Sequence, residues 1–281
     1  MDVLIINVDS KITNIALKKI EMYHQQRGDN VTWDMPMMAG IADKTYVSCI
    51  FDYNRREAEE YEGYGAIIGG SGYDIKGVLP EKIETMKPKI NIGFTTRGCI
   101  RKCPFCIVPE KEGHIRVVGD IYDFWDRESK EIVVLDNNIL AMPEHFKMIC
   151  EQIRDEGLTV DFCQGLDIRL VTDKLAHTLS LLSHRKQIHF AWDNVRDEKA
   201  VMDGIKTMCA YSRPDRLMFY VLIGFNSTEE EDLYRVEKLR SLGVDPFVMP
   251  YDKTDPYQRA FARWVNHKAI FKSVEWKNYT R

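Results

Sequence analysis

Short apolar runs alternate along the chain with segments that repeat apolar residues at helical spacing. Residues 3–8 form an almost continuous apolar run, which is typical of a strand covered on both faces. Residues 11–26 carry Ile12, Ile15 and Ile20 at helical spacing, and Gly28 then provides a stop signal. Further strands are predicted at 31–33, 46–51 and 66–69, with a short helix at 55–61. Residues 1–85 are therefore expected to form a small Rossmann-like α/β unit.

A second α/β series follows a charged, proline-containing linker at residues 79–89. Strands are predicted at 90–96, 131–135, 159–163, 187–192, 217–223 and 245–250. Helices are predicted between them at 144–155, 173–183, 198–211 and 229–242. Six strands are too few for an eight-stranded barrel, so residues 86–252 are predicted to form a partial parallel (β/α)6 barrel. Ligands should gather at the carboxyl ends of its strands.

Composition and charge are those of an ordinary globular protein, with 281 residues, 44% hydrophobic and 29% charged. The net charge of -4 does not indicate a polyelectrolyte partner for the whole chain. No stretch reaches the ~18 apolar residues of a membrane span, so no membrane association is predicted. An acidic residue follows Met1 and no cleavage site follows the apolar run, so a cytoplasmic, reduced protein is expected. Metal or catalytic roles are then favoured over disulfides for its seven cysteines.

The strand predicted at 90–96 runs into a loop that contains Cys99, Cys103 and Cys106. Three thiolates can hold three irons of a cubane cluster and leave the fourth iron without a protein ligand, whereas electron-transfer clusters use a fourth cysteine. A structural zinc site is the alternative, and it requires four ligands. His114 is the nearest histidine downstream, and its separation from Cys106 exceeds the usual short spacing of zinc fingers.

The spacing Cys-x-x-x-Cys-x-aromatic-Cys, with Phe105 at the aromatic position, resembles the signature of the radical S-adenosylmethionine (radical SAM) superfamily. The resemblance covers about residues 90–250, because the strand–helix series also fits that superfamily's partial barrel. It implies that Cys99, Cys103 and Cys106 ligate a [4Fe–4S] cluster whose unique iron is chelated by S-adenosylmethionine (SAM). It also implies reductive cleavage of SAM to a 5′-deoxyadenosyl radical, which abstracts hydrogen from a substrate. A low-potential electron donor such as flavodoxin or ferredoxin is the implied partner.

Polar residues after two of the predicted strands are candidate contacts for the methionine part of SAM. The strand at 131–135 ends in Asp136, Asn137 and Asn138, whose oxygens can accept hydrogen bonds from an ammonium group. The superfamily's usual Gly-Gly-Glu is absent there, and Asp-Asn-Asn also forms turns. The next strand is followed by the polar residues Gln164, Asp167 and Arg169. The guanidinium of Arg169 can bind the carboxylate of SAM through two hydrogen bonds, or it can pair with Asp167 on the surface.

The later strands supply candidate contacts for the adenosine part. Asp193 follows the strand at 187–192 and can accept a hydrogen bond from a ribose hydroxyl or cap the next helix. Ile223 and Gly224 end the strand at 217–223 in a stretch similar to the superfamily's adenine-contacting segment, and a glycine allows close approach of a flat ring. Met249 can close over the adenine or serve as a core residue.

The other four cysteines are widely scattered, so the sequence contains no second cluster-binding loop: they are Cys49, Cys150, Cys163 and Cys209. Methylthiotransferases carry three cysteines in an N-terminal α/β domain, where this chain has only Cys49, so sulfur insertion is disfavoured. Residues 65–74 resemble the glycine-rich stretch of cobalamin-binding domains, although a plain turn explains these glycines equally well. No Asp-x-His-x-x-Gly motif occurs, so cobalamin is disfavoured and the unit is predicted to be a degenerate relative that caps the substrate.

Two basic segments leave alternatives open. Arg101 and Lys102 can form a docking patch for an acidic electron donor, or they can neutralise cluster charge. The C-terminal extension, residues 253–281, interleaves aromatic and basic residues as in nucleic-acid stacking platforms. Phe261, Trp264 and Lys268 nevertheless fall at helical spacing, which favours a helix that packs against the barrel.

The leading hypothesis is a radical SAM enzyme whose substrate is a nucleotide, a nucleic acid or a small metabolite. A non-catalytic iron–sulfur or zinc protein that binds nucleic acid is the alternative from another class. A cobalamin-dependent radical methylase is the third hypothesis.

Overall fold

The computed structural model describes residues 1–279, and the chain divides into two compact units. Each unit contains more than one stretch of chain. Unit 1 consists of Met1–Gly93, Cys106–Gly113 and Tyr122–Glu128. Unit 2 consists of Phe94–Phe105, His114–Ile121 and the chain from Ser129 onward.

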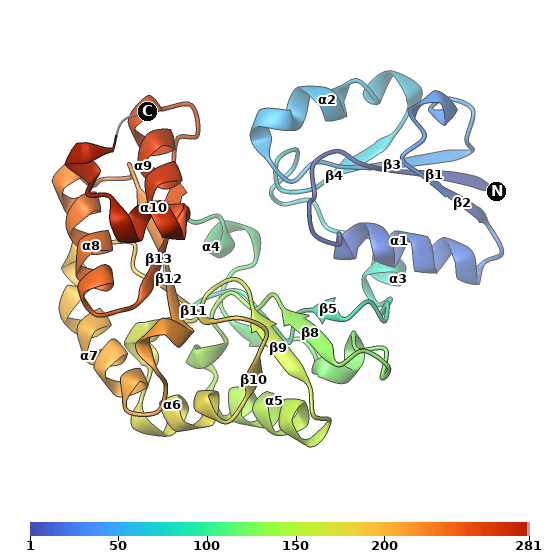
Figure 1. The fold of residues 1–281 in the computed structure, drawn as a ribbon. Coiled ribbons are helices and arrows are strands. Elements are labelled where there is room, and N and C mark those ends of the chain that lie inside the picture. Colours follow the sequence, from blue (N-terminus) through green and yellow to red (C-terminus); the bar gives the residue numbers. More distant parts are fainter. Residues whose placement is uncertain (280–281) are drawn as a thin grey trace. The chain divides into compact units, whose positions relative to one another are not determined.

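Unit 1 is built on a parallel sheet with the strand order β2-β1-β3-β4 (Figure 1). Successive side chains of β1 point to opposite faces, so Val3 and Ile5 enter one core cluster while Leu4 and Ile6 enter the other. Helices α1 and α2 lie on opposite sides of the sheet, which explains why both faces of β1 are apolar. The elements of unit 1 are β1 (Asp2–Asn7), α1 (Ile15–Gln26), β2 (Asn30–Trp33), β3 (Lys44–Ser48), α2 (Arg55–Glu59), β4 (Ile67–Gly69), α3 (Glu81–Glu84), β5 (Ile92–Gly93) and α4 (Val108–Lys111).

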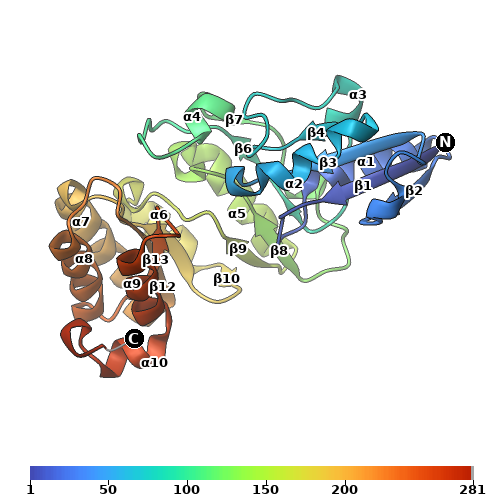
Figure 2. The same cartoon turned by 90° about the horizontal axis from the view of Figure 1, so that it is seen from above.

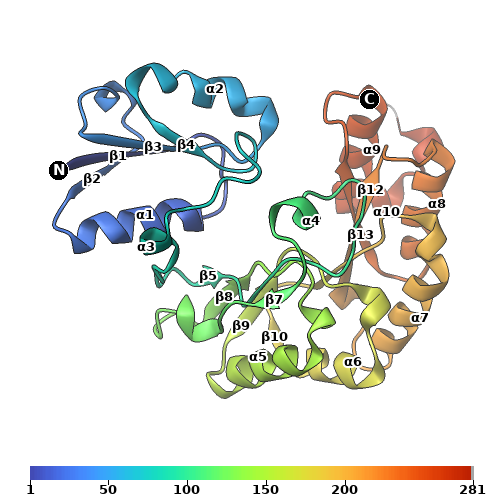
Figure 3. The ribbon, with the colours of Figure 1, turned by 180° about the vertical axis from the view of Figure 1, so that it is seen from behind.

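Helix α1 begins later than the apolar spacing predicts. The side chain of Asn14 accepts a hydrogen bond from the backbone N–H of Leu17 at 3.2 Å, and this cap fixes the first helical residue at Ile15. At the other end of the unit, Lys19 of α1 pairs with Glu84 of α3 at 2.8 Å, and Figure 3 shows these two helices side by side.

Unit 2 contains parallel strands separated by helices, so the predicted α/β class is confirmed. Strand β9 pairs with β8, and β12 pairs with both β11 and β13. A parallel bridge between Leu166 and Phe190 joins β11 to the end of β9. The elements are β6 (Thr96–Arg97), β7 (Arg116–Val117), β8 (Glu131–Val134), α5 (Pro143–Asp155), β9 (Thr159–Phe162), α6 (Asp173–Ser180), β10 (Ser183–His184), β11 (Ile188–Ala191), α7 (Glu198–Cys209), β12 (Leu217–Ile223), α8 (Glu229–Ser241), β13 (Asp245–Pro250), α9 (Pro256–Asn266) and α10 (Lys268–Ser273).

The two faces of the β8–β13 strands differ in burial. On β12, Phe219, Val221 and Ile223 are completely buried, and Figure 1 shows helices α5 to α8 along one side of the strands. Tyr220 and Leu222 point to the opposite face and are half-buried. We call this second face the open face, and it carries the side chains of Asp161, Cys163, His189, Tyr220, Leu222, Phe247 and Met249.

The strand predicted at 90–96 is wrong as a single element. Residues 92–93 and 96–97 form separate two-residue strands, and Thr96–Arg97 pairs antiparallel with Arg116–Val117. Asn91 has a positive φ of 61°, which interrupts the extended backbone at the start of the predicted run. The helix predicted at 173–183 is also too long, because it ends at Ser180 and Ser183–His184 pairs with β9.

The C-terminal segment packs as a helical hairpin rather than presenting its aromatic residues to solvent. Phe261 and Trp264 of α9 are completely buried, so the packing interpretation is confirmed. The side chain of Asn266 bonds to both the N–H and the carbonyl of Val248, at 2.7 and 2.9 Å. It thereby satisfies backbone groups on the edge of β13, beside which α9 lies (Figure 2).

Within residues 1–279, no helix combines the length and the apolar character that a membrane crossing requires.

Candidate functional site

The segment that enters the cysteine loop is held by a buried carboxylate. Asp136 follows β8 and accepts hydrogen bonds from both the N–H and the hydroxyl of Thr95, the former at 2.6 Å. Both residues are almost fully buried. Burial raises the pKa of Asp136, and the hydrogen bonds from Thr95 oppose that rise. Asp136 therefore anchors the chain just before the loop, and its predicted contact with the amino group of SAM stays a prediction.

The sulfur of Cys99 accepts hydrogen bonds from two N–H groups. The backbone N–H of Arg101 lies 3.3 Å from Cys99 Sγ, and Asn138 Nδ2 lies 3.5 Å from it. Hydrogen bonds to sulfur tune the ligands of iron–sulfur clusters, so this environment fits a cluster ligand chemically. Asn138 is 3% exposed, and its Oδ1 atom has no hydrogen-bond partner among the residues that the structure describes. A buried acceptor of this kind is available to a ligand.

All three cysteines of the motif are half-buried. Among residues 1–279, no three His, Cys, Asp or Glu side chains are gathered closely enough to hold a metal ion. The N–H donors at Cys99 fit a cluster ligand, while ligation by Cys99, Cys103 and Cys106 stays a prediction from the spacing. The other cysteines differ, because burial raises the pKa of the Cys49, Cys150, Cys163 and Cys209 thiols and keeps them protonated.

An ion-pair network ties the cysteine loop to the segment after β9. Asp167 Oδ2 accepts from Arg101 Nε at 2.9 Å, and Asp167 Oδ1 accepts from Arg169 Nε at 2.7 Å. Arg169 also pairs with Asp197 at 2.7 Å. Burial alone would raise the pKa of Asp167, but the guanidinium groups of Arg169 and Arg101 outweigh it and lower the pKa. Arg101, predicted to share a docking patch with Lys102, is thus held by Asp167, whereas Lys102 is exposed.

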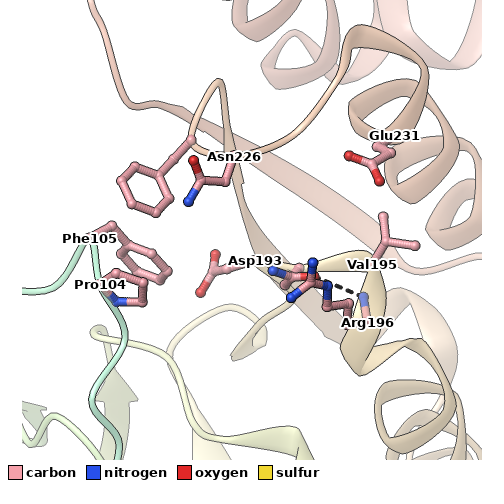
Figure 4. A pocket seen from close by; sticks show the side chains of 9 residues that line it. Pro104, Phe105, Asp193, Val195, Arg196, Asn226 and Glu231 are labelled. Atoms are coloured by element: carbon pink, nitrogen blue, oxygen red, sulfur yellow. Dashed lines mark hydrogen bonds between the residues drawn. The ribbon is translucent and has the colours of Figure 1, made fainter.

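A pocket of about 410 Å³ lies at the carboxyl ends of β11 and β12, where ligands of parallel α/β sheets bind. Figure 4 shows Phe105, Asp193 and Asn226 directed toward a common space. The ring of Phe105 meets the ring of Phe225 edge-on, with centroids 5.6 Å apart. The pocket is lined by Pro104, Phe105, Asp193, Asn194, Val195, Arg196, Phe225, Asn226 and Glu231.

Asp193 is one of two acidic residues that line this pocket, the other being Glu231. The backbone N–H of Leu222 donates to its Oδ1 atom at 3.2 Å. Burial raises the pKa of Asp193, and this N–H opposes the rise. A desolvated carboxylate with few partners is suited to accept a hydrogen bond from a ligand hydroxyl.

The remaining predicted contacts are more dispersed. Gly224 has a φ of +77°, and an added Cβ would lie 2.2 Å from Nε2 of Gln258, so its missing side chain makes room for that amide. Ile223 is completely buried, and Asn137 is half-buried. Gln164 and Met249 are exposed. None of these five residues lines the pocket.

The sequence pointed to the stretch after β12, but the residues of that stretch that line the pocket are Phe225 and Asn226 rather than the predicted Ile223 and Gly224. Phe225 and Asn226 directly follow Gly224, and Asn226 also has a positive φ of 50°. An aromatic residue and an asparagine after the strand-ending glycine were the available signal, because asparagine tolerates this conformation. Asn194 and Arg196 likewise follow the predicted contact Asp193.

Comparison with known proteins gives distant relatives and no matching family model. The chain is 22% identical over 234 residues to the tRNA-2-methylthio-N(6)-dimethylallyladenosine synthase of Flavobacterium johnsoniae, covering 70% of this chain and 45% of that protein. It is 28% identical over 112 residues to the protein of the same name from Flavobacterium psychrophilum, covering 36% of this chain and 21% of that protein. The match thus spans less than half the length of either relative.

Both relatives are named for a modification of tRNA, and the weak homology to them supports the radical SAM superfamily in general. The identity is too low to transfer a substrate. The homology agrees with the cysteine motif, which was recognised independently of it. Together they support a radical SAM function in general for this chain.

Proposed function

We propose that this protein is a radical SAM enzyme in which Cys99, Cys103 and Cys106 bind a [4Fe–4S] cluster and the pocket beside Phe105 binds SAM. The observation that carries the proposal is that the aromatic residue of the cysteine motif lines a pocket at the strand ends. Its volume of about 410 Å³ is typical of small-molecule sites. With cluster and SAM bound, the site would supply a 5′-deoxyadenosyl radical that abstracts hydrogen from the substrate.

The chain's own residues would bind and orient SAM. Phe105 and Phe225 offer aromatic surfaces for the adenine, and Asp193 accepts a ribose hydroxyl. The unpartnered Oδ1 of Asn138 accepts from the amino group. Asp167 holds Arg101 and Arg169 and thereby keeps the cysteine loop against the end of β9.

Methylthiolation is not part of this proposal, although the relatives are named for it. Unit 1 contains Cys49, at the end of β3, outside the motif. Its side chain is completely buried, and burial together with Asp9 raises the pKa of the thiol. Such a cysteine is unsuited to ligate a second cluster.

Anaerobic reconstitution with iron and sulfide tests the proposal. We expect about four irons per chain, a change in the electron paramagnetic resonance spectrum when SAM is added, and 5′-deoxyadenosine after reduction with dithionite. Cys99→Ala, Cys103→Ala and Cys106→Ala should each lose the cluster. Cys209→Ala is the matched control and should retain it.

Two results would contradict the proposal. One is retention of four irons per chain in the Cys99→Ala/Cys103→Ala double variant, which would place the cluster elsewhere. The other is a reconstituted spectrum that does not respond to SAM, which would favour a non-catalytic iron–sulfur protein.

A further inference from the structure

The open face of unit 2 carries a group of ionisable side chains that the proposed SAM pocket does not use. Asp161 of β9 and His189 of β11 face each other, with Asp161 Oδ1 and His189 Nδ1 3.3 Å apart. Tyr220 of β12 lies next to them, and its ring centroid is 5.7 Å from that of His189. Their strand neighbours Val160, Phe190 and Phe219 are completely buried on the opposite face.

The side chains of Asp161 and His189 approach as an ion pair, but their facing atoms lack the geometry of a hydrogen bond. Their side chains are only 20% and 12% exposed. The two facing atoms, Asp161 Oδ1 and His189 Nδ1, are buried, and neither has a hydrogen-bond partner among the described residues. The great majority of buried polar atoms in folded proteins are bonded, and an unsatisfied one is costly. The helices leave this face open, so a ligand can reach the two atoms. We therefore take the unsatisfied atoms to indicate a ligand that supplies their hydrogen bonds.

An aromatic wall stands beside this pair. The hydroxyl of Tyr220 donates to the carbonyl of Cys163 at 2.9 Å, which fixes the ring in place. Burial raises the pKa of Tyr220 to about 12, so the phenol stays neutral. Phe247 of β13 packs edge-on against Tyr220 with centroids 5.9 Å apart and is 43% exposed. A flat apolar surface next to a carboxylate and an imidazole suits a planar heterocycle with polar edges.

The pair also lies on the strand that leads to the SAM pocket. Side chains at His189 and Ala191 point to the same face because β-strand side chains alternate, and Asp193 follows two residues after this strand ends. Four residues of extended chain span at most about 14 Å, so the Cα atoms of His189 and Asp193 lie within that distance of each other. Hydrogen abstraction requires the substrate to lie close to SAM, and a ligand beside His189 would lie near the proposed SAM pocket.

We propose that the open face at Asp161, His189, Tyr220 and Phe247 is the substrate site and that it takes a nucleobase. The base edge bonds to Asp161 and His189, while its ring packs against Phe247. The proposal rests on the radical SAM function proposed above for its chemistry, but the binding itself is independent of cluster and SAM. The base can arrive as a nucleoside or within RNA.

Titration calorimetry on the full chain separates these two sources. The probes are adenosine, guanosine, cytidine, uridine and an unmodified tRNA transcript. We expect one nucleoside or the transcript to bind, and Asp161→Asn, His189→Gln and Phe247→Ala to weaken that binding at least tenfold. The matched controls are His177→Gln on α6 and Asp203→Asn on α7, which lie outside the open face and should bind as the wild type does. Circular dichroism verifies that each variant is folded.

The outcomes distinguish this inference from the proposed function. If the wild type cleaves SAM but binds none of the probes, or if the open-face variants bind as well as the controls, the substrate site is overturned and the radical SAM function stands. If a probe binds through Asp161 and His189 but the reconstituted wild type forms no 5′-deoxyadenosine, the site stands and the proposed function fails.

Discussion

Asp167 joins parts of unit 2 that are far apart in sequence. Its position two residues before Arg169 made a pair between them predictable, and the sequence analysis included it as an alternative. The second pair, with Arg101, was not predictable, because 66 residues separate the two and their meeting depends on the fold. The same reasoning applies to Asp136, whose partner Thr95 lies 41 residues earlier. Sequence patterns locate such polar residues at strand ends, but only tertiary structure pairs them.

Asp167→Asn is expected to destabilise unit 2. The substitution removes the charge that holds Arg101 and Arg169, whose side chains are 36% and 26% exposed. Because both arginines retain some solvent, we expect a loss of about 2 kcal/mol in the free energy of unfolding, below the ~3–5 kcal/mol of a fully buried pair. Urea unfolding measures it. Asp203→Asn, which breaks an exposed pair with Lys199, should leave the free energy of unfolding almost unchanged.

The cost of Asp167→Asn should also depend on pH. The folded state lowers the pKa of Asp167, so its ionised form stabilises the fold above the unfolded value of about 3.9, and this stabilisation is lost as the pH falls through the folded value. Asparagine does not titrate. The stability difference between wild type and variant should therefore be full at neutral pH and shrink below about pH 4. A difference that stayed constant down to acid pH would show that packing, rather than charge, causes it.

At the scale of the element, the predictions succeeded where the apolar pattern is long and uninterrupted. Strand β12, whose seven residues are all apolar or aromatic, begins and ends at the predicted residues, and so does the half-exposed β13. The prediction at 90–96 failed because the backbone there serves other contacts, including the hydrogen bonds between Thr95 and Asp136. Short elements such as β7 and β10 contain two residues each, which is too few for a periodicity to be read.

Gly224→Ala tests the turn that ends β12. The residue has a φ of +77°, and an added Cβ would overlap the side chain of Gln258, whose Oε1 atom accepts from the backbone N–H of Asp252. Backbone strain and displacement of Gln258 should together cost about 2–3 kcal/mol, measured as a lower melting temperature. Gly157→Ala is the control, because its φ is +62° but no atom lies within 4 Å of the added Cβ. Equal costs for both variants would mean that the overlap with Gln258 contributes nothing.

At the scale of the whole molecule, each unit has a hydrophobic core of its own. Leu4 is completely buried in the core of unit 1, and Phe219 is completely buried in the core of unit 2. Unit 1 also includes residues 106–113 and 122–128, which return to it after the chain has entered unit 2. A prediction made strand by strand along the sequence gives contiguous units. It cannot identify segments that return to an earlier unit, because their assignment depends on tertiary contacts and not on the local sequence pattern.

Two core substitutions test whether the units unfold separately. Leu4→Ala should cost about 2–5 kcal/mol and Phe219→Ala about 3–5 kcal/mol, because each leaves a cavity in a packed core. With separate cores, differential scanning calorimetry should show two transitions, and each substitution should lower only one of them. Phe219→Ala should lower the transition of the unit that contains the pocket, while Leu4→Ala should leave that transition in place. If either substitution lowered both transitions equally, the two cores would unfold as one cooperative system.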